Sequence, residues 1–408
     1  MFDLFLSTNV DYVGRTTQQH RATINPATKY IALSASNRAG EGDILGCRVN
    51  KLIGNPQLCR GDGRNCSTRK LMIYRDLTTI HADADMKHWN TYWEAGHLHS
   101  LPGLFHDNYT GSLRKFWEST FARLPSEAKI IDLGTGNGAL ALMALEYSRR
   151  HKLSFEVTGI DSANISPSIP EFIRQHPSSI RFLSKTEMTS TGLPENYFDL
   201  AISQYSIEYA PMTETIRELD RILKKHRGGF AAIVHHESSV ILSRAKQTKR
   251  QINHCKNSGL LSICVKMLEI RERMENHVSA QEKQIYNSLL KQFTSKSLKL
   301  KKFQPQMENP EYLQQFLCLL NDVLDPSKNT NIPINKRLRL LTEYQEQTTA
   351  YMKRLGDLQA AAYSGHDFDQ LTQELRKTGL QVMHLAPIFH HASFIGFSIR
   401  AMRNSCTP

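Results

Sequence analysis

The stretch Lys129–Met143 reads KIIDLGTGNGALALM and decides the fold of the chain around it. An apolar run ends at Asp132, and glycines then alternate at positions 134, 136 and 138 before helix-forming residues begin. We therefore expect a strand, a tight glycine turn and a helix start, where backbone N–H groups and an approachable main chain can meet a ligand. The spacing G-x-G-x-G differs from the dinucleotide pattern G-x-G-x-x-G, and no P-loop lysine follows it. This loop therefore suits a ligand without a polyphosphate.

Strand and helix patterns alternate after this loop, which predicts an α/β domain with a parallel sheet. The expected strands cover residues 129–133, 155–161, 180–183, 198–204 and 229–236. Most of them end in polar residues, and ligands bind at the carboxyl ends of the strands in open α/β sheets. Near the end of the chain, a helix stopped by Gly379 precedes two more expected strands, at 381–387 and 393–402.

Asp132, the three glycines and Asp161 after the second strand resemble motif I and the following acidic residue of class I S-adenosylmethionine (SAM) dependent methyltransferases. The resemblance implies SAM as cofactor and a Rossmann-like, seven-stranded, mostly parallel sheet whose antiparallel last strand is inserted between strands five and six. In that family the acidic residue accepts hydrogen bonds from both ribose hydroxyls, which suits the two oxygens of a carboxylate; a helix N-cap is the alternative role for Asp161. The turn after strand three contacts adenine, which assigns Glu187 and Met188. The predicted cofactor residues are Asp132, Gly134, Thr135, Gly136, Asn137, Gly138, Asp161, Ser162, Glu187, Met188 and Gln204.

Residues 198–210, FDLAISQYSIEYA, resemble the motif IV region of the same family. They contain neither the Asp/Asn-Pro-Pro-Tyr signature of adenine or amide methylation nor a Pro-Cys nucleophile, which disfavours those two classes. Gln204 and Tyr205 stand where the methionine end of the cofactor and the methyl acceptor should meet. His235 and His236 end strand five and are candidate bases because histidine titrates near neutrality, although a structural role is the alternative. Since neighbours on a strand alternate, only one of them can face the site; the predicted catalytic residues are His235, His236 and Tyr205.

Four regions are expected along the chain. Residues 1–85 are predicted to form a poorly ordered basic arm. Residues 86–236 form the N-terminal part of the core, with a helical lid at 86–125 that contains all three tryptophans. Residues 237–362 read as a large helical insertion after strand five, which suits substrate recognition, partner binding, dimerisation or unspecific helical packing. Residues 363–403 complete the core.

Composition restricts the cellular location and the partners that we expect for this protein. No apolar run of about 18 residues occurs, and the first residues lack a basic flank, so we expect neither a membrane span nor a secretory signal, and a cytoplasmic location. The seven cysteines form no C-x-x-C pair, so we expect reduced thiols and no metal site. A net charge of +12 favours anionic partners, although basic helices are also commonly just solvated.

These patterns together favour a SAM-dependent methyltransferase whose acceptor is a small molecule. The alternatives are a protein or RNA methyltransferase, and a SAM-binding regulatory or interaction module without turnover. A nucleic-acid partner is compatible with the charge, but it is not favoured because no RRM-like, OB-like or zinc-ribbon motif accompanies it.

Overall fold

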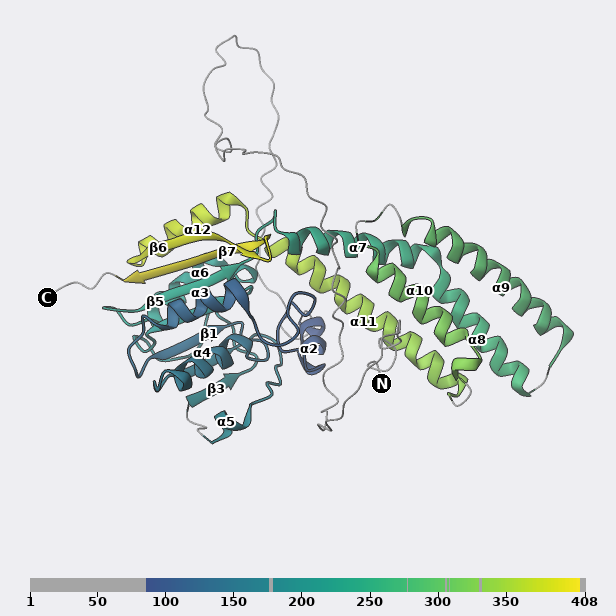
Figure 1. The fold of residues 1–408 in the computed structure, drawn as a ribbon, viewed down its shortest axis with the longest axis horizontal. Helices are drawn as coiled ribbons and strands as arrows, with labels where there is room; N and C mark the ends of the chain where they lie inside the picture. Colours follow the sequence, from purple (N-terminus) through teal and green to yellow (C-terminus); the bar gives the residue numbers. More distant parts are fainter. Residues whose placement is uncertain are drawn as a thin grey trace, which may run out of the picture.

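The computed structural model describes residues 86–175, 179–276, 278–304, 307, 309–329 and 332–403 (Figure 1). The predicted arm at 1–85 lies outside these residues. The strands are β1 Lys129–Leu133, β2 Glu156–Ile160, β3 Ile180–Leu183, β4 Leu200–Gln204, β5 Gly229–Val234, β6 Leu380–His390 and β7 Ser393–Arg403. The helices that accompany the sheet are α2 Lys87–Glu94, α3 Gly111–Phe121, α4 Ala139–Arg150, α5 Glu171–Arg174, α6 Met212–Ile222 and α12 Gly365–Lys377, with the 3-10 turn η3 at Ile207–Tyr209.

The seven strands form one sheet in the order β3-β2-β1-β4-β5-β7-β6. β1 pairs in parallel with β2 and β4, β2 with β3, and β4 with β5. β7 is antiparallel to both of its neighbours, with Gly229 of β5 opposite Met402. The predicted Rossmann-like sheet, with its antiparallel last strand inserted between strands five and six, is confirmed.

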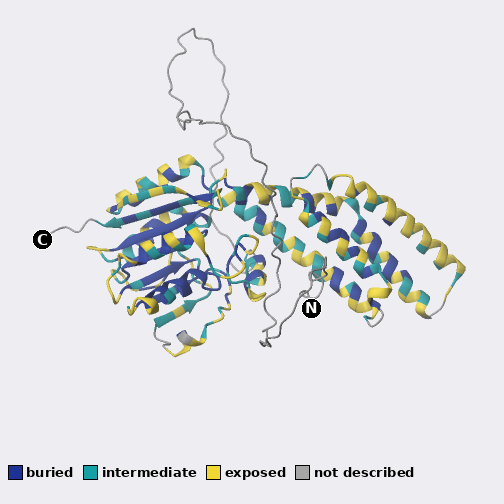
Figure 2. Ribbon diagram, viewed as in Figure 1, coloured by how far each residue is buried: buried dark blue, intermediate teal, exposed yellow. Residues whose placement is uncertain are grey.

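Helices cover both faces of the sheet, as the strand sequences require. All six residues of β5 are buried, a pattern typical of a strand that is covered on two sides. Alternate residues of β1 point to opposite faces: Ile130 packs with α3 and α4, and Ile131 with α6 and α12. The two hydrophobic cores therefore lie on either side of the sheet (Figure 2).

Three strands are shorter than expected. β2 lacks one residue at each end and β5 lacks two at its carboxyl end, where the chain leaves the sheet to form loops, whereas β4 begins two residues later than predicted and ends at Gln204 as predicted. Tyr205, directly after β4, has a φ of +55°, which ends the strand. The last hairpin is longer than predicted, since β6 continues to His390 and joins β7 through His391 and Ala392. Both turn residues have positive φ, as two-residue hairpin turns of type I′ require.

The described residues of the predicted insertion form five helices: α7 Val240–Ser258, α8 Leu260–Asn276, α9 Ala280–Lys301, α10 Glu311–Leu324 and α11 Ile334–Ala361, with the 3-10 turn η5 at Ser327–Asn329. Figure 1 shows them extending away from one end of the sheet. They enclose a hydrophobic core of their own, which includes Cys264, Leu313 and Leu320. α7 leaves the sheet after β5 and α11 returns to it, and the two are joined by a hydrogen bond of 2.9 Å from Lys249 to Gln359. The insertion is therefore a packed helical body attached through two neighbouring helices.

Candidate active site

The glycine loop after β1 has the backbone that its sequence predicts. Residues 134, 136 and 138 have φ of +64°, +53° and +89°, which L side chains rarely adopt. A Cβ atom at Gly134 would collide with the Ser206 side chain, and one at Gly136 would lie 2.5 Å from a ring carbon of Trp93. Only glycine therefore allows the neighbouring side chains to approach the loop this closely.

Two buried carboxyls flank this loop. Asp132 Oδ2 accepts a hydrogen bond from the Thr135 hydroxyl at 2.7 Å, and burial raises the pKa of Asp132 to about 7. Asp161 follows β2 and accepts from the backbone N–H groups of Gly136 at 2.8 Å and Ala163 at 2.9 Å. Burial also raises the pKa of Asp161, to about 6. Asp161 thus fixes the loop to the end of β2, and each of its oxygens keeps a second lone pair for a ligand.

The other predicted cofactor residues occupy three different surroundings. Asn137 is buried and donates to the backbone carbonyls of Trp93 and His97, at 2.9 and 2.8 Å, so it holds the segment before the core. The Met188 side chain lies beside Gly134, whereas Glu187 is exposed to solvent. Ser162 is half-buried in the loop after Asp161.

Gln204 ends β4 and is buried beneath α3. Its Oε1 accepts a hydrogen bond from the Trp117 indole. Its Nε2 is buried and has no partner among the described residues. Gln204 is therefore held at its oxygen, and its amide nitrogen keeps both N–H donors for a ligand.

Helix α2 covers the glycine loop as a lid. The rings of Trp89 and Trp93 are stacked at a centroid distance of 6.1 Å, and Trp93 packs directly over Gly136. The insertion fastens this lid, because Asp357 of α11 accepts hydrogen bonds from Trp89 Nε1 at 3.0 Å and from His88 Nε2. In addition, Arg354 donates to the His88 carbonyl at 3.0 Å. The lid, the loop and the insertion thus meet at one place.

The two histidines after β5 face opposite sides of the strand. The His235 ring stacks on Tyr205 at a centroid distance of 4.1 Å, and burial lowers the pKa of His235 to about 3. His236 packs instead among aromatic rings near α12, including Phe368 and Phe397. Of the predicted catalytic residues, the structure therefore brings Tyr205 and His235 together and separates His236 from them.

Two residues at this end of the sheet were not predicted. Glu208 of η3 is buried, and its Oε1 accepts from the backbone N–H of His235 at 2.8 Å. A carboxylate inside the apolar segment SIEYA is the sequence signal that points to it. Tyr363 donates its backbone N–H to the His235 carbonyl at 3.0 Å. No local pattern indicates this contact, because the two residues are separated by the whole insertion.

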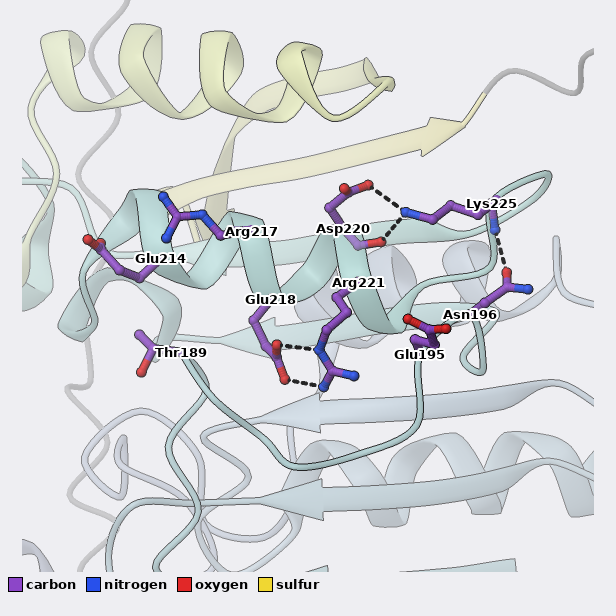
Figure 3. A pocket seen from close by; sticks show the side chains of 9 residues that line it. All are labelled: Thr189, Glu195, Asn196, Glu214, Arg217, Glu218, Asp220, Arg221 and Lys225. Atoms are coloured by element: carbon purple, nitrogen blue, oxygen red, sulfur yellow. Dashed lines mark hydrogen bonds and ion pairs between the residues drawn. The ribbon is translucent and has the colours of Figure 1, made fainter.

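A polar hollow beside α6 lies apart from this site (Figure 3). It is lined by Thr189, Glu195, Asn196, Glu214, Arg217, Glu218, Asp220, Arg221 and Lys225. Arg221 and Lys225 are paired with Glu218 and Asp220, at 2.7 and 3.3 Å. None of the predicted site residues lines this hollow, and its paired charges suit a solvated surface.

Comparison with known proteins agrees with this geometry. The family described as "Methyltransferase domain" matches residues 131–233, which include the glycine loop, Asp161 and β1 to β5. The core of this chain is therefore a class I SAM-dependent methyltransferase domain, and SAM is its cofactor. No curated protein matches the sequence.

Solved structures resemble parts of the chain. A geranyl diphosphate methyltransferase in complex with SAM is 17% identical over 30% of this chain and 48% of its own, with a TM-score of 0.25. A protein from Pyrococcus horikoshii is 21% identical over 33% of this chain and 55% of its own, with a TM-score of 0.26. The Burkholderia thailandensis 1,6-didemethyltoxoflavin-N1-methyltransferase is 10% identical over 72% of this chain and 79% of its own, with a TM-score of 0.33. This chain spans about half the length of the first two, and such likeness carries no information about the acceptor.

Proposed function

We propose that this protein transfers the methyl group of SAM to a small-molecule acceptor that binds where β4 and β5 end beneath the lid. The observation that carries the proposal is the enclosure of this place. Tyr205, Glu208 and His235 are only 5%, 6% and 2% exposed, and Trp89 of α2 packs edge-on against Tyr209 of the same segment. An enclosed site of this kind suits a compact ligand better than a protein chain or a folded RNA.

The residues present fit SAM as the methyl donor. The glycine loop has positive φ at residues 134, 136 and 138, as a close turn beside a ligand requires, and Asp161 offers free lone pairs beside it. SAM supplies an electrophilic methyl group, so the chain has mainly to orient an acceptor and exclude water. We assign the positioning of the acceptor to Tyr205 and His235, whose stacked rings are held by burial. His236 packs on the opposite face of the strand, and we assign it to the aromatic cluster there.

Three alternatives compete with this proposal. A protein or RNA methyltransferase would need the lid to open widely enough to admit a macromolecule, and a SAM-binding regulatory module would bind the cofactor without turnover.

No helix of the described residues is long and apolar enough to cross a membrane. We propose a cytoplasmic location, on the sequence grounds given above.

The test is the fate of a labelled methyl group. The full chain is incubated with methyl-labelled SAM and, separately, with the small-molecule, RNA and protein fractions of a cell extract. We expect label in the small-molecule fraction alone, and its loss with Gly136→Val, whose side chain clashes with Trp93 and distorts the glycine loop. Label only in RNA or protein would replace the proposed acceptor, and SAM binding without any transfer would favour the regulatory module.

A further inference from the structure

A buried carboxyl with one free oxygen lies at the carboxyl ends of β4 and β5. Glu208 uses Oε1 to accept from the His235 backbone, whereas its Oε2 is buried and has no hydrogen-bond partner among the described residues. His235 Nδ1 and Tyr363 Oη are also buried and have no hydrogen-bond partner among the described residues. Buried polar atoms are nearly always hydrogen-bonded in native proteins, so three orphaned atoms at one end of the sheet call for a missing partner.

Aromatic rings surround this carboxyl. Tyr205 stacks on His235, and Tyr209 meets the same imidazole edge-on at a centroid distance of 6.5 Å. Tyr209 also meets Trp89 of the lid edge-on at 6.0 Å, so a row of rings leads from the lid to the carboxyl. Flat walls of this kind suit a flat, largely apolar ligand.

The charges around Glu208 restrict the ligand further. The titratable groups that face it are Tyr205 and Tyr209 on its own segment, His235 after β5, and Tyr363 before α12. No lysine or arginine within the described ranges pairs with the Glu208 carboxyl. An anionic acceptor would find no counter-charge here, whereas an O–H or N–H group can donate to the free oxygen.

We propose that Glu208 takes the proton of the methyl acceptor, and that this acceptor is a neutral aromatic compound with an O–H or N–H group. The inference rests on the proposed function and specifies its substrate class. The acceptor oxygen or nitrogen forms a bond to the methyl carbon of SAM, the carbon–sulfur bond breaks with its electron pair on sulfur, and the acceptor proton passes to Glu208 Oε2. Glu208 is thus the catalytic base, and Tyr205 and His235 hold the ring of the acceptor.

This role gives the reaction a defined pH dependence. Burial raises the pKa of Glu208 to about 8, because the charged form is poorly solvated there. Only the carboxylate can take a proton, so the rate of transfer rises with pH through about 8. The same rise is absent when residue 208 cannot ionise.

The experiment uses the full chain, methyl-labelled SAM and two sets of probes. The neutral set is 2-naphthol, indole and benzimidazole, and the anionic set is 2-naphthoate and phenyl phosphate. The test variant is Glu208→Gln, which keeps an oxygen to accept from the His235 backbone. The control is Glu218→Gln in α6, a residue that is also buried but bonds to Thr191 and Arg221.

We expect label on at least one neutral probe and none on the anions. Glu208→Gln should lower kcat by about 10²- to 10⁴-fold with little change in KM and should remove the pH rise, while Glu218→Gln keeps both. A second measurement needs no turnover: the infrared carbonyl band of protonated carboxyls should lose a component through about pH 8 in the wild type. This component should be missing from Glu208→Gln, whereas the components of Asp132 and Asp161, whose pKa values are about 7 and 6, should remain.

Three results would overturn the inference: methylation of the anionic set alone, an unchanged pH profile in Glu208→Gln, or an infrared component titrating at about pH 8 that Glu208→Gln retains. If neither set is methylated but the small-molecule fraction of a cell extract is, this inference fails and the proposed function stands. If label enters only RNA or protein, the proposed function itself fails.

Discussion

Replacing Gly136 by alanine should loosen the lid by a predictable amount. Residue 136 has a φ of +53°, and its new Cβ would lie 2.5 to 2.9 Å from three carbons of the Trp93 ring. The left-handed backbone costs an alanine about 1 to 2 kcal/mol, and overpacking of this kind costs a further ~1 to 3 kcal/mol. Only the second cost depends on the lid, because it is relieved when α2 moves away.

Hydrogen exchange of the α2 amides measures that second cost. When reclosing is fast, exchange follows the population of the open lid. A clash of about 1 to 3 kcal/mol raises this population roughly 5- to 150-fold, since each 1.36 kcal/mol is tenfold. Gly192→Ala is the matched control: it has a φ of +66° and nothing within 4 Å of its new Cβ, so α2 should exchange as in the wild type.

A double mutant makes the assignment specific to Trp93. Trp93→Ala should open the lid by itself, and adding Gly136→Ala to it should change the exchange of α2 no further, because the ring that clashes is absent. If Gly136→Ala leaves the exchange of α2 at the wild-type rate, then Trp93 does not press on the loop and the described packing of the lid is wrong.

The remaining predictions concern the cofactor, the lid, pH and charge. Asp161→Asn should weaken SAM binding by about 1.5 to 3 kcal/mol, the scale for a hydrogen bond to a charged group, and unchanged affinity by calorimetry in a folded variant would remove Asp161 from the cofactor site. Asp357→Asn should speed hydrogen exchange of the α2 amides several-fold, because the charge-assisted hydrogen bonds from the lid are lost. Glu343→Gln, on the exposed face of the same helix, should not, and equal effects of the two variants would show that Asp357 does not hold the lid. Burial raises the pKa values of Asp132 and Asp161 to about 7 and 6, so these carboxyls bind more protons in the folded state and their contribution to the free energy of unfolding falls as pH rises from about 4 to about 7, whereas the lowered pKa of His235 contributes with the opposite sign. The difference in the free energy of unfolding between the wild type and Asp132→Asn, measured by chemical denaturation at both limits, should therefore fall over this range, and a rise would contradict the prediction. At about 0.1 M salt the dissociation constant for RNA should lie no lower than the non-specific range of ~10⁻⁴ to 10⁻⁶ M. A salt-sensitive, submicromolar complex would contradict this prediction if the complex is lost when four lysines are replaced by glutamine: Lys296, Lys299, Lys301 and Lys302.

Local patterns were enough to predict the strands but not their full order in the sheet. The glycine loop, the strands and the final hairpin follow from residues that are close in sequence, whereas the antiparallel last strand between strands five and six was predicted from the resemblance to class I methyltransferases. Alternation along a strand also predicted that His235 and His236 face opposite sides, although it could not say which one meets Tyr205. That choice depends on where Tyr205 turns, which its positive φ decides.

Contacts between distant segments could not be predicted in this way. The bonds from the lid to Asp357 join residues more than 260 positions apart, and no local signal marks them. Glu208 was overlooked for a different reason: a glutamate is usually solvated, and only the tertiary structure reveals that this one is buried with an oxygen to spare.

The placement of β7 has a consequence for how the chain folds. Its pairing with β5 joins residues roughly 170 positions apart, and contacts that distant form slowly because a long loop must close first. During synthesis β1 to β5 can pair before β7 exists, which leaves the outer edge of β5 open to wrong partners. The insertion emerges in that interval with a core of its own, and the pairing of α7 with α11 brings the chain back to the waiting strand. We therefore expect the helical insertion to hold the chain segments on either side of it close together during synthesis, which protects the incomplete sheet from aggregation.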